Sequence, residues 1–202
     1  EGGVRTRDEL ETLLCAGDEA PLVFAAAREQ RARHSGDAVF LYGFVYFSTY
    51  CRNACAFCFY RADNDECPRY RKTTDEVVGI CRDLAASGVV LLDLTMGEDP
   101  EVLDEPATLA DLVGAVVEAT GTPVMVSPGV LTEPALRDLS RAGADWYALY
   151  QETHTRALYD RLRVGQPFEE RAAARAAARR AGLLVEDGLL TGIGDTPADR
   201  AA

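Results

Sequence analysis

The chain has 202 residues, of which 48% are hydrophobic, and a formal net charge of −12 from 33 acidic and 21 basic residues. This length and composition suit one globular domain with a sizeable core. No basic face of the kind that nucleic acids attract stands out, so we expect no nucleic-acid partner. The longest apolar run, Ala38 to Phe47, has about half of the ~20 residues that a membrane-spanning helix needs. The first five residues lead into no apolar signal region, so we expect a cytoplasmic protein without membrane contact.

Residues 1–36 predict a helical extension that precedes the main domain. Thr6 and Glu9 can form a capping box at the start of a first helix, which continues as an apolar stripe of leucines. A second helix is predicted from about Pro21 to His34, and Gly36 breaks it.

Residues 37–202 alternate between apolar runs and helical patterns. Capping residues and closing glycines mark most of the helices, as Thr73 with Glu76 and then Gly88 do for the first of them. The apolar runs predict buried strands at residues 38–47, 89–96, 123–127, 145–150 and 183–190, with helices between them and a last helix starting at residues 195–197. Such alternation is typical of an α/β protein with a parallel sheet.

A (β/α) TIM-type barrel is the natural closure of this sheet, but a full barrel of eight strands takes about 250 residues. About five β/α units are recognisable, so we expect an incomplete barrel in this chain. A doubly wound open sheet is the alternative, although no GxGxxG sequence follows any predicted strand.

Three of the six cysteines, Cys51, Cys55 and Cys58, lie within eight residues in a C-x3-C-x2-C spacing. With no export signal, this crowding favours metal binding over a disulfide framework, and we expect the other three cysteines to be free thiols. Thiolates suit iron–sulfur clusters or zinc, but structural zinc takes four ligands. Three cysteines on a four-iron cluster leave one iron open for chemistry. The loop also follows the first strand, on the catalytic face of a parallel barrel.

With Phe57 just before the third cysteine, this spacing resembles the signature of the radical S-adenosylmethionine (SAM) superfamily. The resemblance implies that Cys51, Cys55 and Cys58 hold a [4Fe-4S] cluster, that SAM binds the open iron, and that one electron cleaves SAM to a 5′-deoxyadenosyl radical. The alternatives are three incidental buried cysteines or a zinc site.

Gly97 and Glu98, at the end of the second predicted strand, resemble the family's GGE-type motif, which holds the amino group of SAM. Met96 stands where that motif has its first glycine. A glycine lets a ligand approach the backbone, and a carboxylate pairs with an ammonium group. The alternative is that these residues form an ordinary turn, in which the same residue types are common.

Glu152 and Arg171 match, in place and order, the SAM-binding Glu and Arg of the biotin-synthase-like subgroup. The resemblance implies that Glu152 accepts hydrogen bonds from the ribose and that Arg171 clamps the carboxylate of SAM. It also implies that Ile193 lines the adenine. The alternatives are a solvated helix arginine at position 171 and a plain strand-to-helix turn around Ile193.

Within that subgroup, several stretches resemble the group that holds the methylornithine synthases of pyrrolysine biosynthesis: residues 51–53, 62–64, 69–71, 93–100, 144–154 and 163–168. The resemblance implies a mutase that isomerises L-lysine to (3R)-3-methyl-D-ornithine, reduced by a donor such as flavodoxin or ferredoxin. We nominate Asp93 and Ser127, both near strand ends, for the amino groups of the substrate, because a buried carboxylate needs a partner. The alternative for both is a hydrogen-bonded residue at a strand end.

Two features depart from this group. Phe59 follows the third cysteine where these relatives usually have glycine, and the last strands of the barrel are absent. Mutase activity is therefore expected if the C-terminal part is present in the native protein, because an open site admits water to a radical. A biotin synthase or an [FeFe]-hydrogenase maturase type of enzyme, an inactive truncated fragment and a zinc protein remain as alternatives.

Overall fold

The computed structural model describes residues 3, 4 and 6–202. Residues 1, 2 and 5, which belong to the expected N-terminal extension, lie outside the described residues. The strands are β1 (Tyr42–Ser48), β2 (Leu91–Met96), β3 (Val124–Ser127), β4 (Trp146–Ala148) and β5 (Leu184–Glu186). The helices are α1 (Arg7–Leu14), the 3₁₀ helix η1 (Gly17–Glu19), α2 (Ala20–Ser35), α3 (Thr74–Ala86), α4 (Pro100–Asp104), α5 (Ala107–Thr120), α6 (Glu133–Ala142), α7 (Arg156–Leu162), α8 (Phe168–Arg180) and α9 (Pro197–Arg200).

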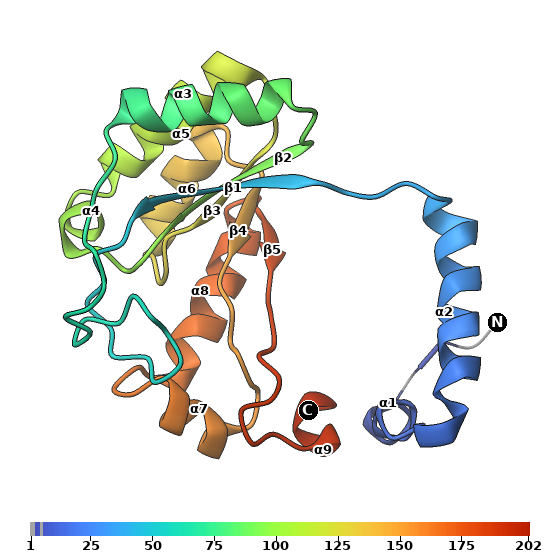
Figure 1. Ribbon diagram of the computed structural model, residues 1–202. Helices are drawn as coiled ribbons and strands as arrows, with labels where there is room; N and C mark the ends of the chain where they lie inside the picture. The colour runs from blue at the N-terminus through green and yellow to red at the C-terminus, as the bar shows by residue number, and fades with distance from the viewer. Residues whose placement is uncertain (1–2, 5) are drawn as a thin grey trace.

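The five strands form one parallel sheet in which each strand pairs with the next one in the chain, in the order β1-β2-β3-β4-β5. At least one helix connects each strand to the next, as Figure 1 shows. This order is how a (β/α) barrel is built. Over the described residues the sheet stays open, with β1 and β5 at its edges. The expectation of a partial TIM-type barrel is therefore confirmed.

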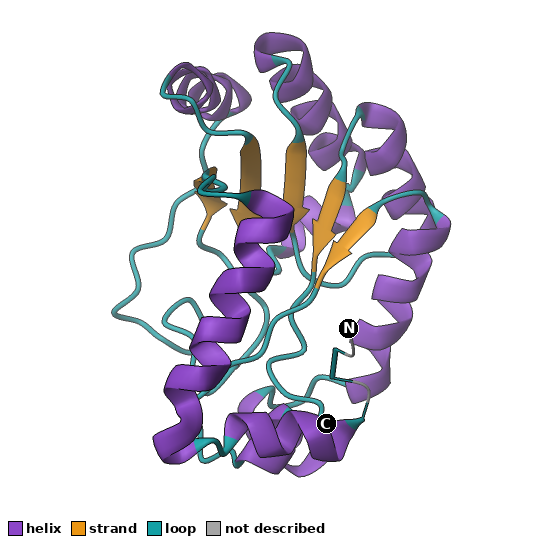
Figure 2. Ribbon diagram, turned by 90° about the vertical axis from the view of Figure 1, so that its right-hand side faces the viewer, coloured by secondary structure: helices purple, strands orange, loops and turns teal. Residues whose placement is uncertain are grey.

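Helices α3, α5, α6 and α8 lie on the outer face of the sheet (Figure 2), and the sheet residues that face them form the main core. Leu92, Leu94, Val124 and Val126 are fully buried there, because their side chains alternate toward the helices. The opposite face would be the barrel interior, and its residues are less uniformly covered. On β1, for example, Phe44 is 53% exposed. The outer face thus carries the stability of the fold, while the inner face is left for polar side chains and for a site.

Local signals placed the helix ends well. Thr73 and Glu76 form the expected capping box at the start of α3, and Gly143 ends α6 at φ 102°, a backbone region that favours glycine. The short helix α4 was not predicted, although its signals are present in the sequence. Asp99 caps it by accepting a hydrogen bond from the amide of Glu101, with Pro100 in the first turn.

Strand ends were predicted less well, and the first predicted strand was wrong at its start. β1 begins at Tyr42, opposite Leu91 of β2, so residues 38–40 have no strand to pair with in the described part of the chain. Phe40 is accordingly 80% exposed. The last predicted strand was too long, because after Glu186 the side chain of Asp187 accepts a hydrogen bond from the Gln151 amide, at 2.7 Å, in place of a regular ladder.

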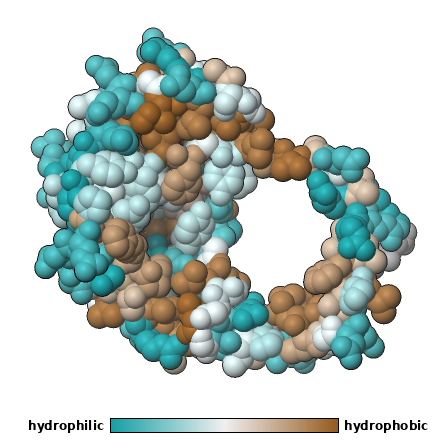
Figure 3. All heavy atoms as spheres, in the orientation of Figure 1, coloured by the Kyte–Doolittle hydropathy of each residue, from teal (hydrophilic) through white to brown (hydrophobic). Residues whose placement is uncertain are grey.

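The helices α1 and α2 precede the sheet and have no buried residues. The guanidinium of Arg7 donates to the carbonyl of Ala198, at 2.8 Å. The first helix therefore contacts α9, which lies close to the last residue of the chain. Figure 1 shows these helices set apart from the sheet, and the space-filling view in Figure 3 shows an opening between the two parts. Among the described residues, no helix has the length and apolarity to cross a membrane.

Candidate metal and cofactor site

The loop that follows β1 brings the three predicted cysteine ligands to one cavity of about 210 Å³. Cys55 is buried, whereas Cys51 and Cys58 are half-buried, and none of the three forms a disulfide. Burial raises the pKa of both Cys51 and Cys58 above that of an ordinary thiol. Metal ligation requires the thiolate, so a bound cation is what would ionise these two residues.

The arrangement of these sulfurs matters for the kind of metal. Within residues 3, 4 and 6–202, no group of three or more His, Cys, Asp or Glu side chains converges on the position of a single metal ion. A structural zinc ion needs four such ligands around one point. Cysteines that each bind a different iron of a cluster need not converge in this way. Three soft thiolates around a shared cavity therefore fit an iron–sulfur cluster with one open iron.

A single arginine holds the cysteine loop in shape. The Arg69 guanidinium donates to four backbone carbonyls of the loop, those of Thr49, Tyr60, Arg61 and Asn64. The Tyr60 bond measures 2.9 Å and the Asn64 bond 3.3 Å. Because the planar guanidinium presents its donors in a fixed fork, it ties together carbonyls that no regular secondary structure satisfies.

Gly97 lines the same cavity, but the space where its side chain would lie is already occupied. A Cβ atom at Gly97 would lie 2.3 Å from the Tyr50 carbonyl oxygen and 2.7 Å from Cβ of Cys51. The absence of a side chain at Gly97 lets the end of β2 pack directly against the cysteine loop. A contact between SAM and the backbone of Gly97 stays a prediction.

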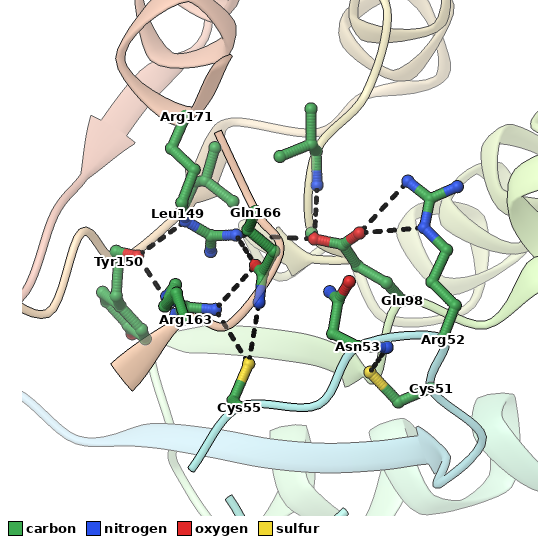
Figure 4. A network of polar contacts seen from close by, with 12 residues as sticks. Cys51, Arg52, Asn53, Cys55, Glu98, Leu149, Tyr150, Arg163, Gln166 and Arg171 are labelled. Atoms are coloured by element: carbon green, nitrogen blue, oxygen red, sulfur yellow. Dashed lines mark hydrogen bonds and ion pairs between the residues drawn. The ribbon is translucent and has the colours of Figure 1, made fainter. Parts of the chain in front are cut away.

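The Glu98 carboxylate is buried in a cationic environment at the wall of the cavity (Figure 4). One oxygen is 3.2 Å from Nε of Arg52, and the other is 3.4 Å from Nη1 of Arg171 and 3.2 Å from the amide of Val130. Arg171 reaches this point from α8, and burial together with the neighbouring Arg163 lowers its pKa. Glu98 and Arg171 thus present opposite charges side by side, which complement the ammonium and carboxylate of an amino acid.

Glu152 follows β4 with a φ of 68°, the one positive value among the described non-glycine residues. A non-glycine residue with a positive φ costs conformational energy, and it keeps this backbone conformation only where surrounding contacts hold it. Here the amide of Glu152 donates to the carbonyl of Gly188, at 3.0 Å, and its carboxylate accepts from Nη2 of Arg163 at 2.5 Å. The carboxylate is therefore fixed at the cavity wall, where a ligand hydroxyl can reach it.

Asp93 is fully buried on the inner face of β2. Neither of its oxygens has a hydrogen-bond partner in the described part of the chain. Burial, with a smaller contribution from the charge of Glu186, raises its pKa to about 7. Ser127, on the same face of the neighbouring strand, lines the cavity and donates weakly to the Ala148 carbonyl at 3.4 Å. A buried carboxylate without a partner is costly, which points to a cationic ligand.

The remaining predicted residues differ in their position. Phe57 lines the cavity and is 38% exposed. Ile193 lies in the loop after β5, outside the set of cavity-lining residues, and its carbonyl accepts a hydrogen bond from Arg161 at 2.8 Å. Its assignment to the adenine stays a prediction. A second cavity, of about 260 Å³ beside Phe47 and α5, contains none of the predicted residues.

Two residues of this site were given no role from the sequence, namely Arg163 and Gln166. Both contact Cys55 from the segment that follows α7. The only signal in the sequence was the stretch 163–168, which carried a resemblance but no chemistry of its own. Their contact with Cys55 spans more than a hundred positions of the chain, so only the tertiary structure reveals it.

The fold agrees with comparison to known proteins. Residues 45–202 match the model of the radical SAM superfamily, and the chain belongs to this family. Its cofactors are accordingly a [4Fe-4S] cluster and SAM, as predicted. The alternative of a zinc protein is thereby set aside.

Within the family, the chain is similar to the 3-methylornithine synthase of Methanosarcina barkeri, with 44% identity over 96% of this chain and 56% of that protein. A crystal structure of methylornithine synthase has a TM-score of 0.92 and 42% identity, over 98% of this chain and 59% of that one. The [FeFe] hydrogenase maturase subunit HydE of Thermotoga maritima is 30% identical over 93% of this chain and 54% of its own length. The chain thus spans a little over half the length of the curated relatives it matches.

Proposed function

We propose that the full-length protein is a methylornithine synthase, which isomerises L-lysine to (3R)-3-methyl-D-ornithine for pyrrolysine biosynthesis. The observation that carries this proposal is the buried, unpartnered Asp93 on the inner face of the sheet. A carboxylate of this kind suits a substrate with a side-chain ammonium group, such as lysine. The 44% identity to a 3-methylornithine synthase supports the same substrate.

In this proposal Cys51, Cys55 and Cys58 hold the cluster. When bound, the cluster and SAM supply a radical that abstracts hydrogen from the substrate. Glu98 and Arg171 bind the amino-acid end of SAM, and Glu152 accepts hydrogen bonds from its ribose. Their positions around one cavity support these roles.

Three further residues complete the cofactor site. Gly97 lets the end of β2 lie against the cluster loop and lines the cavity beside SAM, and Phe57 and Ile193 line the nucleoside. Asp93 and Ser127 face the barrel interior and bind the amino groups of the substrate. All of these residues lie within 37–202, which we propose as the barrel domain, with residues 1–36 as an extension that contributes none of them.

The partner in this reaction is a one-electron donor, for which flavodoxin and ferredoxin are candidates. Thiolate ligands and a reducing donor fit a cytoplasmic location. The net charge of −12 gives no support for a nucleic-acid partner.

The test is anaerobic reconstitution of the full-length protein with iron and sulfide, followed by electron paramagnetic resonance (EPR) of the dithionite-reduced protein. We expect a [4Fe-4S] signal that changes when SAM is added, and formation of methylornithine from lysine, measured by mass spectrometry. A signal that ignores SAM would contradict the cofactor assignment. A signal that responds to SAM without any lysine turnover would contradict the substrate and leave a biotin-synthase-like or maturase-like reaction in its place.

A further inference from the structure

Arg163, at the end of α7, lies at the centre of the polar network in Figure 4 and is only 8% exposed. Its Nη1 is 3.5 Å from Sγ of Cys55. Its Nη2 donates to Oε1 of Glu152 at 2.5 Å and to the carbonyl of Tyr150 at 3.2 Å. One guanidinium therefore connects a cluster cysteine to the carboxylate that we assign to the ribose.

Gln166 makes a second contact with the same sulfur. Its Nε2 donates to Sγ of Cys55 at 3.1 Å. Its Oε1 accepts from Nη1 of Arg163 at 3.4 Å and from Nη1 of Arg171 at 3.3 Å. Two cations on the oxygen side orient the amide, so that its N–H group points at the sulfur (Figure 4).

The backbone fixes the distance between this segment and the cluster loop. The amide of Ala56, next to Cys55, donates to the carbonyl of Leu162 at 2.8 Å. The amide of Gln166 donates to the carbonyl of Arg163 at 3.0 Å, which shapes the turn after α7. The two side-chain donors are thus held in place by contacts that do not depend on the sulfur.

Arg163 also has an unused donor. Its Nε is buried and has no hydrogen-bond partner in the described part of the chain. Buried donors of native proteins are normally satisfied, so the orphaned Nε indicates that a ligand with acceptor atoms completes this wall of the cavity. Arg163 lines that cavity together with all three cysteines.

We propose that Arg163 and Gln166 are positioning residues that hold the Cys55 thiolate and raise the reduction potential of the cluster. The inference rests on the proposed role of Cys55 as a cluster ligand. Reduction adds a negative charge to the cluster, and hydrogen bonds to its sulfurs favour that charge. Arg163 adds a second effect, because it neutralises Glu152, whose partly buried carboxylate would otherwise repel the electron.

The test is an EPR-monitored redox titration of the cluster-loaded full-length protein and of four variants. Gln166→Met removes the N–H donor, and Arg163→Met removes both the donor and the charge. Arg163→Lys keeps the positive charge but lacks the planar set of N–H donors that the guanidinium presents. The control is Arg156→Met, which removes the same charge from an exposed residue of α7 that is paired with Glu169.

We expect Gln166→Met and Arg163→Met each to lower the ratio of reduced to oxidised cluster at least about tenfold at the wild-type midpoint potential, which corresponds to a shift of ~59 mV for a one-electron couple. Arg163→Met should have the larger effect, Arg163→Lys should recover part of it, and Arg156→Met should leave the midpoint unchanged. The milder Gln166→Met keeps the test decisive if Arg163→Met does not fold.

Variants whose loaded clusters keep the wild-type midpoint would overturn the inference, even if they carry less iron, because a purely structural role changes cluster content alone. A cluster that still responds to SAM at an unchanged midpoint would overturn this inference and leave the proposed function standing. Failure of the wild-type protein to form any cluster would instead contradict the proposed function.

Discussion

The unpaired carboxylate of Asp93 makes a quantitative prediction about stability. Burial raises its pKa from an ordinary 3.8 to about 7, so between these values the unfolded chain is ionised while the folded chain keeps its proton. Stability therefore falls as pH rises through this window and levels off above it. At ~1.36 kcal/mol for each pH unit, the full cost is about 4 kcal/mol, of which about 2 kcal/mol arises between pH 5.5 and 8.

Asp93→Asn removes the ionisation, so its stability relative to the wild type should rise by about 2 kcal/mol between pH 5.5 and pH 8. The assay is urea denaturation of both full-length proteins, kept cluster-free and reduced, across this range. The exposed Asp111→Asn serves as the matched control and should give a constant difference. If the difference between Asp93→Asn and the wild type also stays constant with pH, the carboxylate is not the buried, costly group inferred here.

In the loaded enzyme the same variant should raise the KM for lysine at least about tenfold, because the amide cannot pair with an ammonium group.

Three other predictions concern the cysteine loop. Gly97→Ala places a Cβ 2.3 Å from the Tyr50 carbonyl, so we expect a loss of about 1–3 kcal/mol in urea denaturation, and a stability equal to the wild type would contradict the close packing. Arg69→Lys loses the fork that satisfies four loop carbonyls, and iron analysis should show a cluster content at least about threefold lower; full occupancy would show that the loop holds its shape alone. Cys55→Ala should abolish the [4Fe-4S] EPR signal while Cys67→Ala retains it, and equal loss in both would reassign the ligands.

The polar network around the cavity explains why its residues are sensitive to one another. Arg171 contacts both Glu98 and Gln166, and Gln166 contacts both Arg163 and Cys55. Buried networks of this kind are stable when every member is satisfied and costly when one is removed. Substitutions within it should therefore be compared by double-mutant cycles and not by adding single effects.

Features that depend on neighbours along the chain could be predicted from the amino-acid sequence. The Thr73–Glu76 capping box, the glycine that ends α6 and the spacing of the three cysteines are local patterns, and each has a physical reason that acts within one or two turns. The alternation of apolar runs with amphipathic segments predicted the parallel sheet, because consecutive strands joined by a helical crossover lie parallel. These signals were sufficient for the fold class, whereas the cofactors were predicted from the resemblance of the cysteine spacing to the radical SAM signature.

The residues at which strands begin and end, and the contacts that individual polar side chains make, depend on the tertiary structure. β1 starts at Tyr42 only because β2 offers Leu91 opposite it. Asp93 is unpaired only because no cation from another strand reaches it within the described residues. Gly97 is needed because the cysteine loop packs against it, and Arg163 matters because α7 delivers it to Cys55. Each of these facts depends on the distance between segments far apart in the chain, which no local pattern records, since burial and charge pairing are properties of the packed molecule.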